Sequence, residues 1–238
     1  MKKRSGRQPS EPSSACRAEI WTPAEICRRL RRRYGPIQPP PAEPVLDSLI
    51  RTVLSQHTSA AGCLAAWENL RRQFPAWQAA LRATTKEMIQ VLRPAGLAQQ
   101  RAKTIRAILQ HLHAQQVGLS LEFLHDWPTE KAWEYLLRFP GVGPKTAACV
   151  LMFACGRPVL PVDTHVHRVA KRLGLIPSKC SAAKAQELLG QQVPARWVLE
   201  FHLQLIRHGR RTCLARHPRC QECPLRAKCA FYGDLVTR

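Results

Sequence analysis

The sequence predicts an all-α fold, and three observations support this prediction. Apolar residues recur at helical spacing along most of the chain, whereas no segment alternates apolar and polar residues as a half-buried strand does. The connections between the periodic segments are short and rich in Pro or Gly, as in helical bundles. With 238 residues, 45% of them hydrophobic, the chain can form one large domain or two small ones around an ordinary core.

Capping signals place the first helices. Thr22 offers a capping hydroxyl and Glu25 can return the cap, so a helix should begin here and end at Gly35, followed by a linker over residues 36–44. A further helix should begin near Ser59 and stop at Phe74. The expected apolar stripes of the next two helices are Leu46, Leu49, Ile50, Val53 and Leu54, then Cys63, Leu64, Trp67 and Leu70.

The later helices follow from similar signals. Thr84 and Glu87 repeat the capping box, Pro94 and Gly96 close that short helix, and Thr129 should cap another. Their apolar stripes are Met88, Val91 and Leu92; Ile105, Ile108, Leu109 and Leu112; Trp133, Leu136 and Leu137; and Ala147, Val150, Leu151 and Ala154. Three more helices are expected over residues 164–173, 182–190 and 196–208.

The charge balance indicates a polyanionic partner. The 37 Lys and Arg against 16 Asp and Glu give a formal net charge of +21, which would repel itself unless a polyanion offset it. A membrane surface is less favoured, because the charge is scattered over every predicted helix and loop, and no apolar stretch approaches the ~18 residues of a spanning segment. We therefore expect nucleic acid, and no membrane, as the partner.

The first 21 residues should form a disordered basic tail. This segment is rich in Ser and Pro and lacks an apolar core, so it does not have the features of a signal peptide. A phosphate-seeking tail is the simple interpretation. An organelle transit peptide stays open as an alternative, although no amphipathic period supports it.

The ten cysteines do not form the pattern of a disulfide framework. Isolated cysteines on apolar helix faces, such as Cys63 and Cys149, are typical of reduced packing residues, which indicates the reducing cytosol. Four others fall within the last part of the chain, in the pattern Cys213-x6-Cys220-x2-Cys223-x5-Cys229. Four thiolates so close together predict a metal centre, but spacing alone does not choose between zinc and a [4Fe–4S] cluster.

Two predicted helices are joined by Gly141-Val142-Gly143. The glycines allow a sharp turn and a close approach to a ligand, and Pro144 suits the first position of the following helix. The free N–H groups of that helix start can bind phosphate oxygens. A tight corner between helices without any ligand is the alternative.

The stretch from Leu137 to Leu151, followed by VDTHVHRV, resembles the helix-hairpin-helix superfamily of DNA glycosylases, and most closely the endonuclease III family. The resemblance covers about residues 22–232. It includes the hairpin, the separation of Lys145 from Asp163, the tract from Leu54 to Gln56, the segment His208-Gly209-Arg210, and the four cysteines, all in family order.

The resemblance implies that Lys145 is a nucleophile and Asp163 a catalytic carboxylate. A lysine amine attacks only when it is neutral, which the positive end of a helix favours. Attack on the sugar C1′ would release the base and leave a Schiff base, and β-elimination would then nick the strand. Asp163 would stabilise the developing positive charge and assist proton transfers. Taken without the family, Lys145 is a phosphate contact and Asp163 an ordinary helix N-cap.

The family motif also favours a [4Fe–4S] cluster at Cys213, Cys220, Cys223 and Cys229. The cluster would need only a structural role. By holding the loop between its first two ligands rigid, it would present Arg216 and Arg219 to the DNA backbone.

Two loops are suited to fill the gap left by an extruded nucleotide. Gln56 and His57 follow one predicted helix, and Leu97 aligns with a family loop that inserts an apolar side chain. Family members commonly have Gln at the position of His57 and an acidic residue at that of Ala60, which puts opposite-base preference and one pocket contact in doubt. Solvated or locally packed loop residues are the alternative. The scattered histidines His165, His167, His202 and His208 are expected to be structural or phosphate-facing.

The resemblance implies two lobes with the active-site cleft between them. One is a helical barrel over residues 46–157, with the helix-hairpin-helix at about 132–155. The other combines residues 22–45 and 158–232 around the cluster, and residues 233–238 form a tail. The implied function is excision of oxidised pyrimidines from duplex DNA with strand cleavage, in a monomer of the cytoplasm that associates with the nucleoid. An adenine-mismatch glycosylase, a non-catalytic DNA-binding module and a zinc-dependent nucleic-acid binder are the alternatives.

Overall fold

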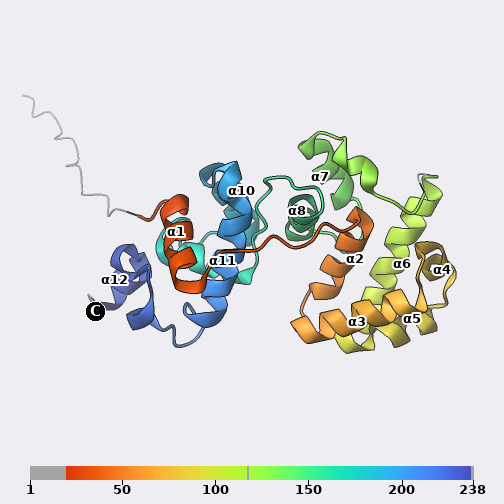
Figure 1. Cartoon of the computed structure of the whole chain (residues 1–238), viewed down its shortest axis with the longest axis horizontal. Coiled ribbons are helices and arrows are strands. Elements are labelled where there is room, and N and C mark those ends of the chain that lie inside the picture. The colour runs from red at the N-terminus through yellow and green to blue at the C-terminus, as the bar shows by residue number, and fades with distance from the viewer. Residues whose placement is uncertain (1–19, 117, 237–238) are drawn as a thin grey trace, which may run out of the picture.

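The computed structural model describes residues 20–116 and 118–236, which form helices and connecting loops without any strand (Figure 1). This confirms the all-α prediction. The α-helices are α1 (Pro23–Tyr34), α2 (Val45–Ser55), α3 (Ala60–Gln73), α4 (Trp77–Arg82), α5 (Thr85–Leu92), α6 (Ala98–Ala114), α7 (Thr129–Leu137), α8 (Pro144–Phe153), α9 (Thr164–Leu173), α10 (Ala182–Gln192), α11 (Val198–Arg211) and α12 (Ala230–Val236). The short 3-10 helix η1 (Arg93–Ala95) joins α5 to the segment before α6.

The described residues bury two separate hydrophobic cores, which give the molecule two lobes (Figure 1). The first core is built from α2 to α8, and the second from α1, the end of α8, and α9 to α11. Our boundary after residue 157 stays a prediction, but Met152 and Phe153, inside α8, already pack in or against the second core. Within the described residues, no helix combines the length and apolarity needed to cross a membrane.

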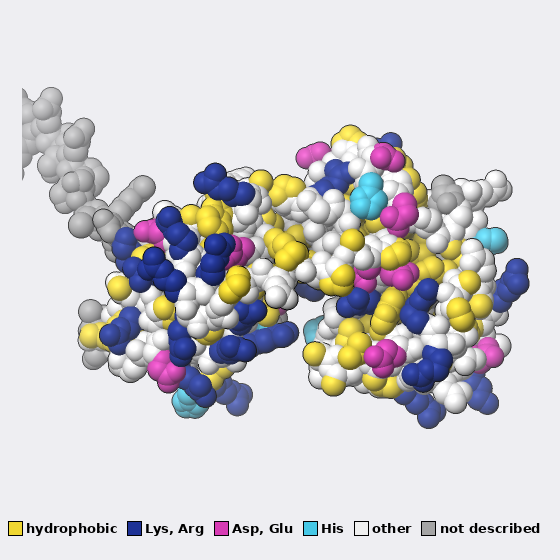
Figure 2. Space-filling model, viewed as in Figure 1, with side chains coloured by type: hydrophobic (Ala, Val, Ile, Leu, Met, Phe, Trp, Pro, Cys, Tyr) yellow, Lys and Arg dark blue, Asp and Glu magenta, His cyan; other side chains and the backbone are white. Residues whose placement is uncertain are grey.

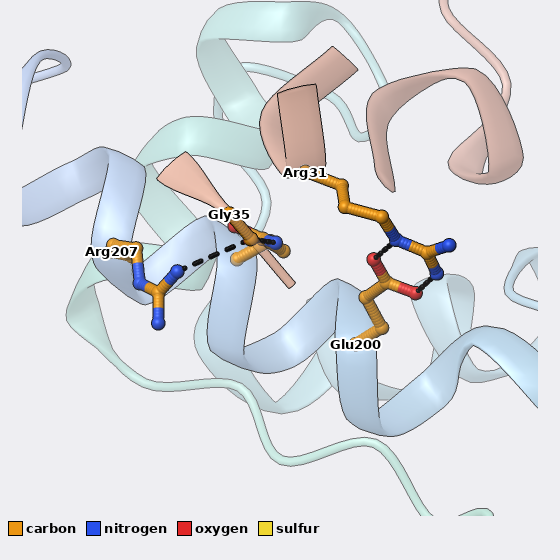
Figure 3. Close-up of polar contacts among 5 residues, drawn as sticks. Arg31, Gly35, Glu200 and Arg207 are labelled. Carbon is orange, nitrogen blue, oxygen red and sulfur yellow. Dashed lines mark hydrogen bonds and ion pairs between the residues drawn. The ribbon is translucent and has the colours of Figure 1, made fainter. Parts of the chain in front are cut away.

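α1 lies far in sequence from the helix it packs against, α11 (Figure 3). Arg31 pairs with Glu200 through two hydrogen bonds, one of them from Nε to Oε1 at 2.7 Å. At the end of α1, the Arg207 Nη1 donates to the Tyr34 carbonyl oxygen at 2.8 Å and to that of Gly35 at 3.3 Å. α1 and α11 thus belong to the same lobe, and the linker before α2 crosses to the other.

Local capping is confirmed at several helix starts. Thr22 with Glu25, and Thr84 with Glu87, form complete capping boxes. The prediction that Thr129 caps α7 is wrong: the N-cap is Pro128, and the Thr129 hydroxyl accepts a hydrogen bond from Arg157 at 2.8 Å.

Some predicted stripes and tails also differ from the structure. Leu64 and Leu137 are 56% and 37% exposed, because Ala66 and Ala132 occupy the buried faces of α3 and α7 instead. Trp21, assigned to the basic tail, is buried, and its indole N–H donates to the Leu225 carbonyl oxygen at 2.7 Å. Residues 1–19 of that tail lie outside the described residues. The predicted tail from residue 233 is helical as far as Val236, within α12.

Candidate active site and cysteine cavity

The hairpin between α7 and α8 depends on one glycine conformation. Gly141 has φ +76°, and a Cβ on it would lie 2.9 Å from the Thr104 Cγ2 of α6, so only glycine fits. Gly143 is different: its backbone is extended, and a Cβ would meet no atom within 4 Å. Val142 is buried, and its N–H donates to the Phe139 carbonyl oxygen at 3.1 Å. Gly141 therefore shapes the turn, Val142 anchors it, and Gly143 leaves open space for a ligand.

The start of α8 offers unused hydrogen-bond donors. In the described part of the chain, the N–H groups of Gly141, Gly143 and Lys145 donate to no acceptor, and Pro144 occupies the first helical position. Free N–H groups and the positive end of a helix together attract phosphate oxygens. The geometry of this segment is consistent with the phosphate-binding role that the sequence suggests.

Lys145 and Asp163 occupy the starts of two different helices. Lys145 is the second residue of α8 and is half-buried. Asp163 is the N-cap of α9, and its Oδ1 accepts a hydrogen bond from the Val166 N–H at 2.8 Å. The N-cap interpretation of Asp163 is thereby confirmed. Because this cap uses one carboxylate oxygen, the second oxygen remains available to other groups.

Two buried residues lie within electrostatic range of both Lys145 and Asp163. The pKa of the Cys149 thiol, one turn after Lys145 on α8, is raised by burial and by Asp163, while the charge and a hydrogen bond of Lys145 oppose this. Burial lowers the pKa of His202 to about 4, with Asp163 acting against the shift and Lys145 adding to it. Both charges therefore lie near the same two side chains, Cys149 and His202.

His202 on α11, which the sequence led us to expect as a structural or phosphate-facing histidine, lies near both candidate catalytic residues. Its side chain is 2% exposed and packs edge-on against the ring of Phe153, with 5.9 Å between ring centroids. The Nδ1 atom lies 2.9 Å from the Pro161 carbonyl oxygen. Because a carbonyl can only accept, Nδ1 carries the proton, and Nε2 of the neutral ring is an acceptor. No local motif marks His202, because the groups that surround it, such as Pro161 and Asp163, lie about 40 residues away in the sequence.

The residues predicted to enter DNA lie on two loops with strained backbone. His57 is exposed with φ +50°, and Leu97 is 63% exposed with φ +45°. Left-handed backbone at bulky residues is rare and costs energy, which makes both positions candidates for function. The Gln56 side chain instead bonds within the protein, donating to the Thr146 hydroxyl at 3.1 Å and the Gly141 carbonyl oxygen at 3.4 Å. This contact ties the first loop to the hairpin.

The four cysteines of the C-terminal motif line one cavity together with Arg172 and His208. Arg172 Nη1 donates to the Cys213 Sγ at 3.3 Å, and the His208 Nε2 lies 3.7 Å from the Cys223 Sγ. Burial raises the pKa of the Cys220, Cys223 and Cys229 thiols, and neighbouring thiols raise it further. Removing four thiolates from water without a cation would therefore be costly, and the donor set fits a thiolate-bound metal centre.

The loop that begins at this cavity is held by its own backbone. The Arg219 N–H donates to the Thr212 carbonyl oxygen at 2.9 Å, and His217 between them adopts φ +50°. Arg216 and Arg219 are both exposed on it. Among the described residues, no group of three or more His, Cys, Asp or Glu side chains is arranged to hold a single metal ion.

The surface around these sites is strongly basic. Figure 2 shows the molecule hollowed between the two lobes, with Lys and Arg side chains gathered over the lobe that contains α1 and α11. Arg33, Arg210, Arg211 and Arg219 line one groove of this lobe. A basic surface beside a phosphate-binding helix start is the electrostatic pattern expected of a protein that contacts nucleic acid.

Comparisons with known proteins agree with this architecture. The family model of the HhH-GPD superfamily base excision DNA repair proteins matches residues 50–195. The chain is 31% identical to the endonuclease III of Thermotoga maritima over 208 residues, which is 87% of this chain and 90% of that protein. It is 36% identical over 168 residues to an Arabidopsis thaliana protein named as a candidate DNA glycosylase, which covers 71% of this chain and 57% of the relative.

A solved structure has the same arrangement of helices. A non-covalent endonuclease III–DNA complex aligns with a TM-score of 0.77 and 25% identity, over 92% of this chain and 100% of that one. The chain belongs to the HhH-GPD superfamily of base excision DNA repair proteins and, within it, to the endonuclease III family.

Proposed function

We propose that the protein is a bifunctional DNA glycosylase and abasic-site lyase that removes oxidised pyrimidines from duplex DNA. The single observation that carries this proposal is the placement of an amine and a carboxylate, Lys145 and Asp163, at two helix starts that act on the same buried groups. Membership of the endonuclease III family and the phosphate-binding hairpin support it.

The proposed reaction begins at the deoxyribose. The neutral Lys145 amine attacks C1′, the bond from C1′ to the base breaks, and the base leaves with its bonding electrons and takes up a proton. The amine then loses a proton as the sugar ring opens to a Schiff base. Abstraction of a C2′ proton drives β-elimination, in which the bond from C3′ to oxygen breaks and the phosphate leaves. Hydrolysis of the Schiff base regenerates Lys145.

Asp163 and the surrounding residues prepare this reaction. The Asp163 carboxylate stabilises the positive charge that develops on the sugar and assists the proton transfers. The donor groups of the α8 start hold a phosphate next to the reacting nucleotide, so that the sugar is presented to the amine. His202, neutral with Nε2 as acceptor, can accept a hydrogen bond from an ammonium or a protonated carboxyl in this site.

Borohydride trapping tests the proposal. Duplex DNA with an abasic site should become covalently linked to the wild-type chain, since only a Schiff base is reduced to a stable amine. Lys145→Gln should abolish the trapped product, whereas Lys184→Gln, an exposed lysine of α10, should leave it unchanged. Base release without trapping by the wild type would instead indicate a monofunctional enzyme, such as an adenine-mismatch glycosylase. Binding without either reaction would indicate a non-catalytic DNA-binding module.

We further propose that Cys213, Cys220, Cys223 and Cys229 hold a [4Fe–4S] cluster. The shared cavity, the thiol chemistry and the family motif support this assignment. The cluster would supply rigidity to the loop that carries Arg216 and Arg219, which would contact the DNA backbone. Iron and sulfide analysis of anaerobically purified protein tests it, because zinc without iron would contradict the cluster.

The partner and the location follow from the same proposal. Duplex DNA with a damaged base or an abasic site would be the substrate of a monomer in the cytoplasm, associated with the nucleoid. The nine described cysteines form no disulfide. A panel of duplexes, each with one lesion, compares oxidised pyrimidines with other damaged bases. Equal activity on all of them would contradict the substrate class.

A further inference from the structure

Arg101 is a buried arginine on the largely apolar inner face of α6. Its side chain is 4% exposed, and its neighbours on this face, Ile105 and Ile108, are part of the first core. Burial lowers the pKa of the guanidinium, and no carboxylate pairs with it in the described part of the chain. A buried charge without a counter-charge is costly, so its retention needs another reason.

The guanidinium binds three carbonyl oxygens from two loops. Nη1 donates to Ala95 at 2.8 Å and to Gly96, and Nη2 donates to Gln56. Nε has no hydrogen-bond partner in the described residues, so the contacts do not even satisfy the whole group. Arg101 therefore connects two loops that are 40 residues apart in sequence, rather than stabilising its own helix.

Each of these loops continues directly into a strained and exposed residue. His57 follows Gln56 and Leu97 follows Gly96, and both adopt left-handed backbone. The loops are also pressed together by their flanking helices. A Cβ on Gly62, near the start of α3, would lie 2.6 Å from the Pro94 carbonyl oxygen, so α3 and η1 are in direct contact there.

We infer that Arg101 is a positioning residue that fixes the spacing of the two loops, so that His57 and Leu97 enter a DNA duplex as one two-part wedge. This inference rests on the proposed function, in which a nucleotide must leave the stack. Extrusion costs free energy, and side chains that fill the vacated space offset this cost only when they are held in place. One guanidinium that binds both loops by their backbones holds their separation while leaving both side chains free.

Arg101→Met tests this role, because methionine keeps an apolar stem and removes the donors. Strand cleavage at an abasic site in duplex DNA should fall by about 10- to 100-fold, as expected for misplaced positioning groups. Cleavage of the same site in a single strand should not change, since no stack has to be opened. Arg101→Lys retains a charge but not the two-armed donor, and should recover only part of the duplex rate.

Arg157→Met is the matched control. Arg157 also binds backbone, donating to the carbonyl oxygens of Leu124 and His125 at 2.9 and 3.0 Å. These two residues belong to a short 3-10 helix that is bonded to the start of α2, whereas His57 follows the end of α2. Arg157→Met should lower the free energy of unfolding, but it should change the rates of cleavage of duplex and single-stranded DNA by the same factor. If Arg101→Met and Arg157→Met had the same ratio of duplex to single-strand cleavage rates, the inference would be overturned.

Non-additivity gives the second readout. In a His57→Ala, Leu97→Ala background there is no wedge to position, so Arg101→Met should produce no further loss of the duplex rate. A merely structural arginine would lower the rate by the same factor in both backgrounds, and that result would also overturn the inference.

A fluorescence measurement separates this inference from the proposed chemistry. A duplex with a tetrahydrofuran abasic analogue opposite 2-aminopurine cannot react, but wedge entry unstacks the 2-aminopurine and raises its emission. Wild type and Lys145→Gln should both give this rise, and Arg101→Met should lose most of it while Arg157→Met retains it. If the wild type raises the 2-aminopurine emission but is not trapped on reactive DNA, the proposed lyase function is wrong and the inference about Arg101 is unaffected. Absence of any rise with wild type would end the inference.

Discussion

Among the described residues, the two lobes bury equal numbers of polar side chains and use them differently. In the first lobe, Ser48, Arg101, Thr104 and Thr146 are buried. Three of these four contact the hairpin or the two wedge loops, so their role is to shape backbone at the surface. In the second lobe, the buried polar residues are His202, Gln204, His208 and Thr212, which lie on or directly after one helix, α11.

The row on α11 runs from one chemical site to another. His202 lies at the candidate active site, and His208 lies beside Cys223 in the cysteine cavity. His208 Nδ1 is also 2.9 Å from the Tyr34 hydroxyl, which lies 2.6 Å from the Thr212 hydroxyl. The first lobe uses its buried polar groups to hold loop backbone, whereas we expect the stability of the second lobe to depend on the two ionic sites that its buried polar groups adjoin. Four predictions test this contrast.

The largest effect is expected at the cysteine cavity. Cys223→Ser should remove the metal centre and destabilise the protein by several kcal/mol, because the binding free energy of a structural metal is part of the folding free energy. Iron content together with thermal unfolding of the full chain measures this. Cys63→Ser, a half-buried cysteine against the first core, is the control and should retain full iron content. Equal destabilisation by both variants would break the contrast between the lobes.

His202 should make stability depend on pH. Its folded pKa of about 4 lies below the ordinary value of 6.5, so the folded state keeps the neutral ring. As the pH falls, the unfolded chain takes up a proton on His202 at a higher pH than the folded protein does. The contribution of His202 to the free energy of unfolding should therefore be fully present above pH 6.5 and should decrease, by at most about 3 kcal/mol, as the pH drops toward 4. Denaturant unfolding at several pH values measures this, and the free energy of unfolding should depend less steeply on pH in His202→Gln than in the wild type. The same pH dependence in His202→Gln as in the wild type would contradict the assignment. So would an equal reduction of the pH dependence in His113→Gln, which changes an exposed histidine.

The two hairpin glycines should separate folding from binding. Gly141→Ala forces a side chain into left-handed backbone and against Thr104, and should cost about 1–3 kcal/mol of stability. Gly143→Ala meets no protein atom, so its stability should be unchanged, but the methyl group enters the proposed phosphate space and should weaken duplex binding. Urea unfolding and fluorescence anisotropy with labelled duplex distinguish these outcomes. Equal stability losses in both variants would contradict the assigned roles.

The smallest effect is expected for the surface pair between α1 and α11. Arg31 is nearly half exposed in its pair with Glu200, so solvent and salt screen the attraction. Arg31→Ala should lower the melting temperature less than any change above, and the difference from wild type should shrink further in high salt. A large, salt-independent loss would mean that the second lobe relies on this pair as well as on its buried row.

Much of the fold could be predicted because its signals are local. The capping boxes at Thr22 and Thr84, the cap at Asp163 and the glycine turn at Gly141 all act within three or four residues, so the sequence alone locates them. The cap assigned to Thr129 was wrong, because a distant arginine, Arg157, takes up its hydroxyl. The short helices α4 and α12 also escaped prediction, since their few residues contain no complete apolar period.

The candidate site divides in the same way. Lys145, Asp163 and the four cysteines stand in motifs whose spacing identifies them, although their roles came from resemblance to a family. Arg101 and His202 stand in no motif. Each is a polar residue on the buried face of a helix, and the sequence does not indicate its partners.

The sequence by itself therefore determined where most of the helices begin, where the chain turns at the hairpin, and which residues have reactive chemistry. Only the tertiary structure decided that Arg101 meets Gln56 and Gly96, and that the charges of Lys145 and Asp163 act on His202. The physical reason is the range of the interactions. A cap or a turn is satisfied by its neighbours in the chain, whereas a buried polar group is stable only with partners that distant segments bring to it.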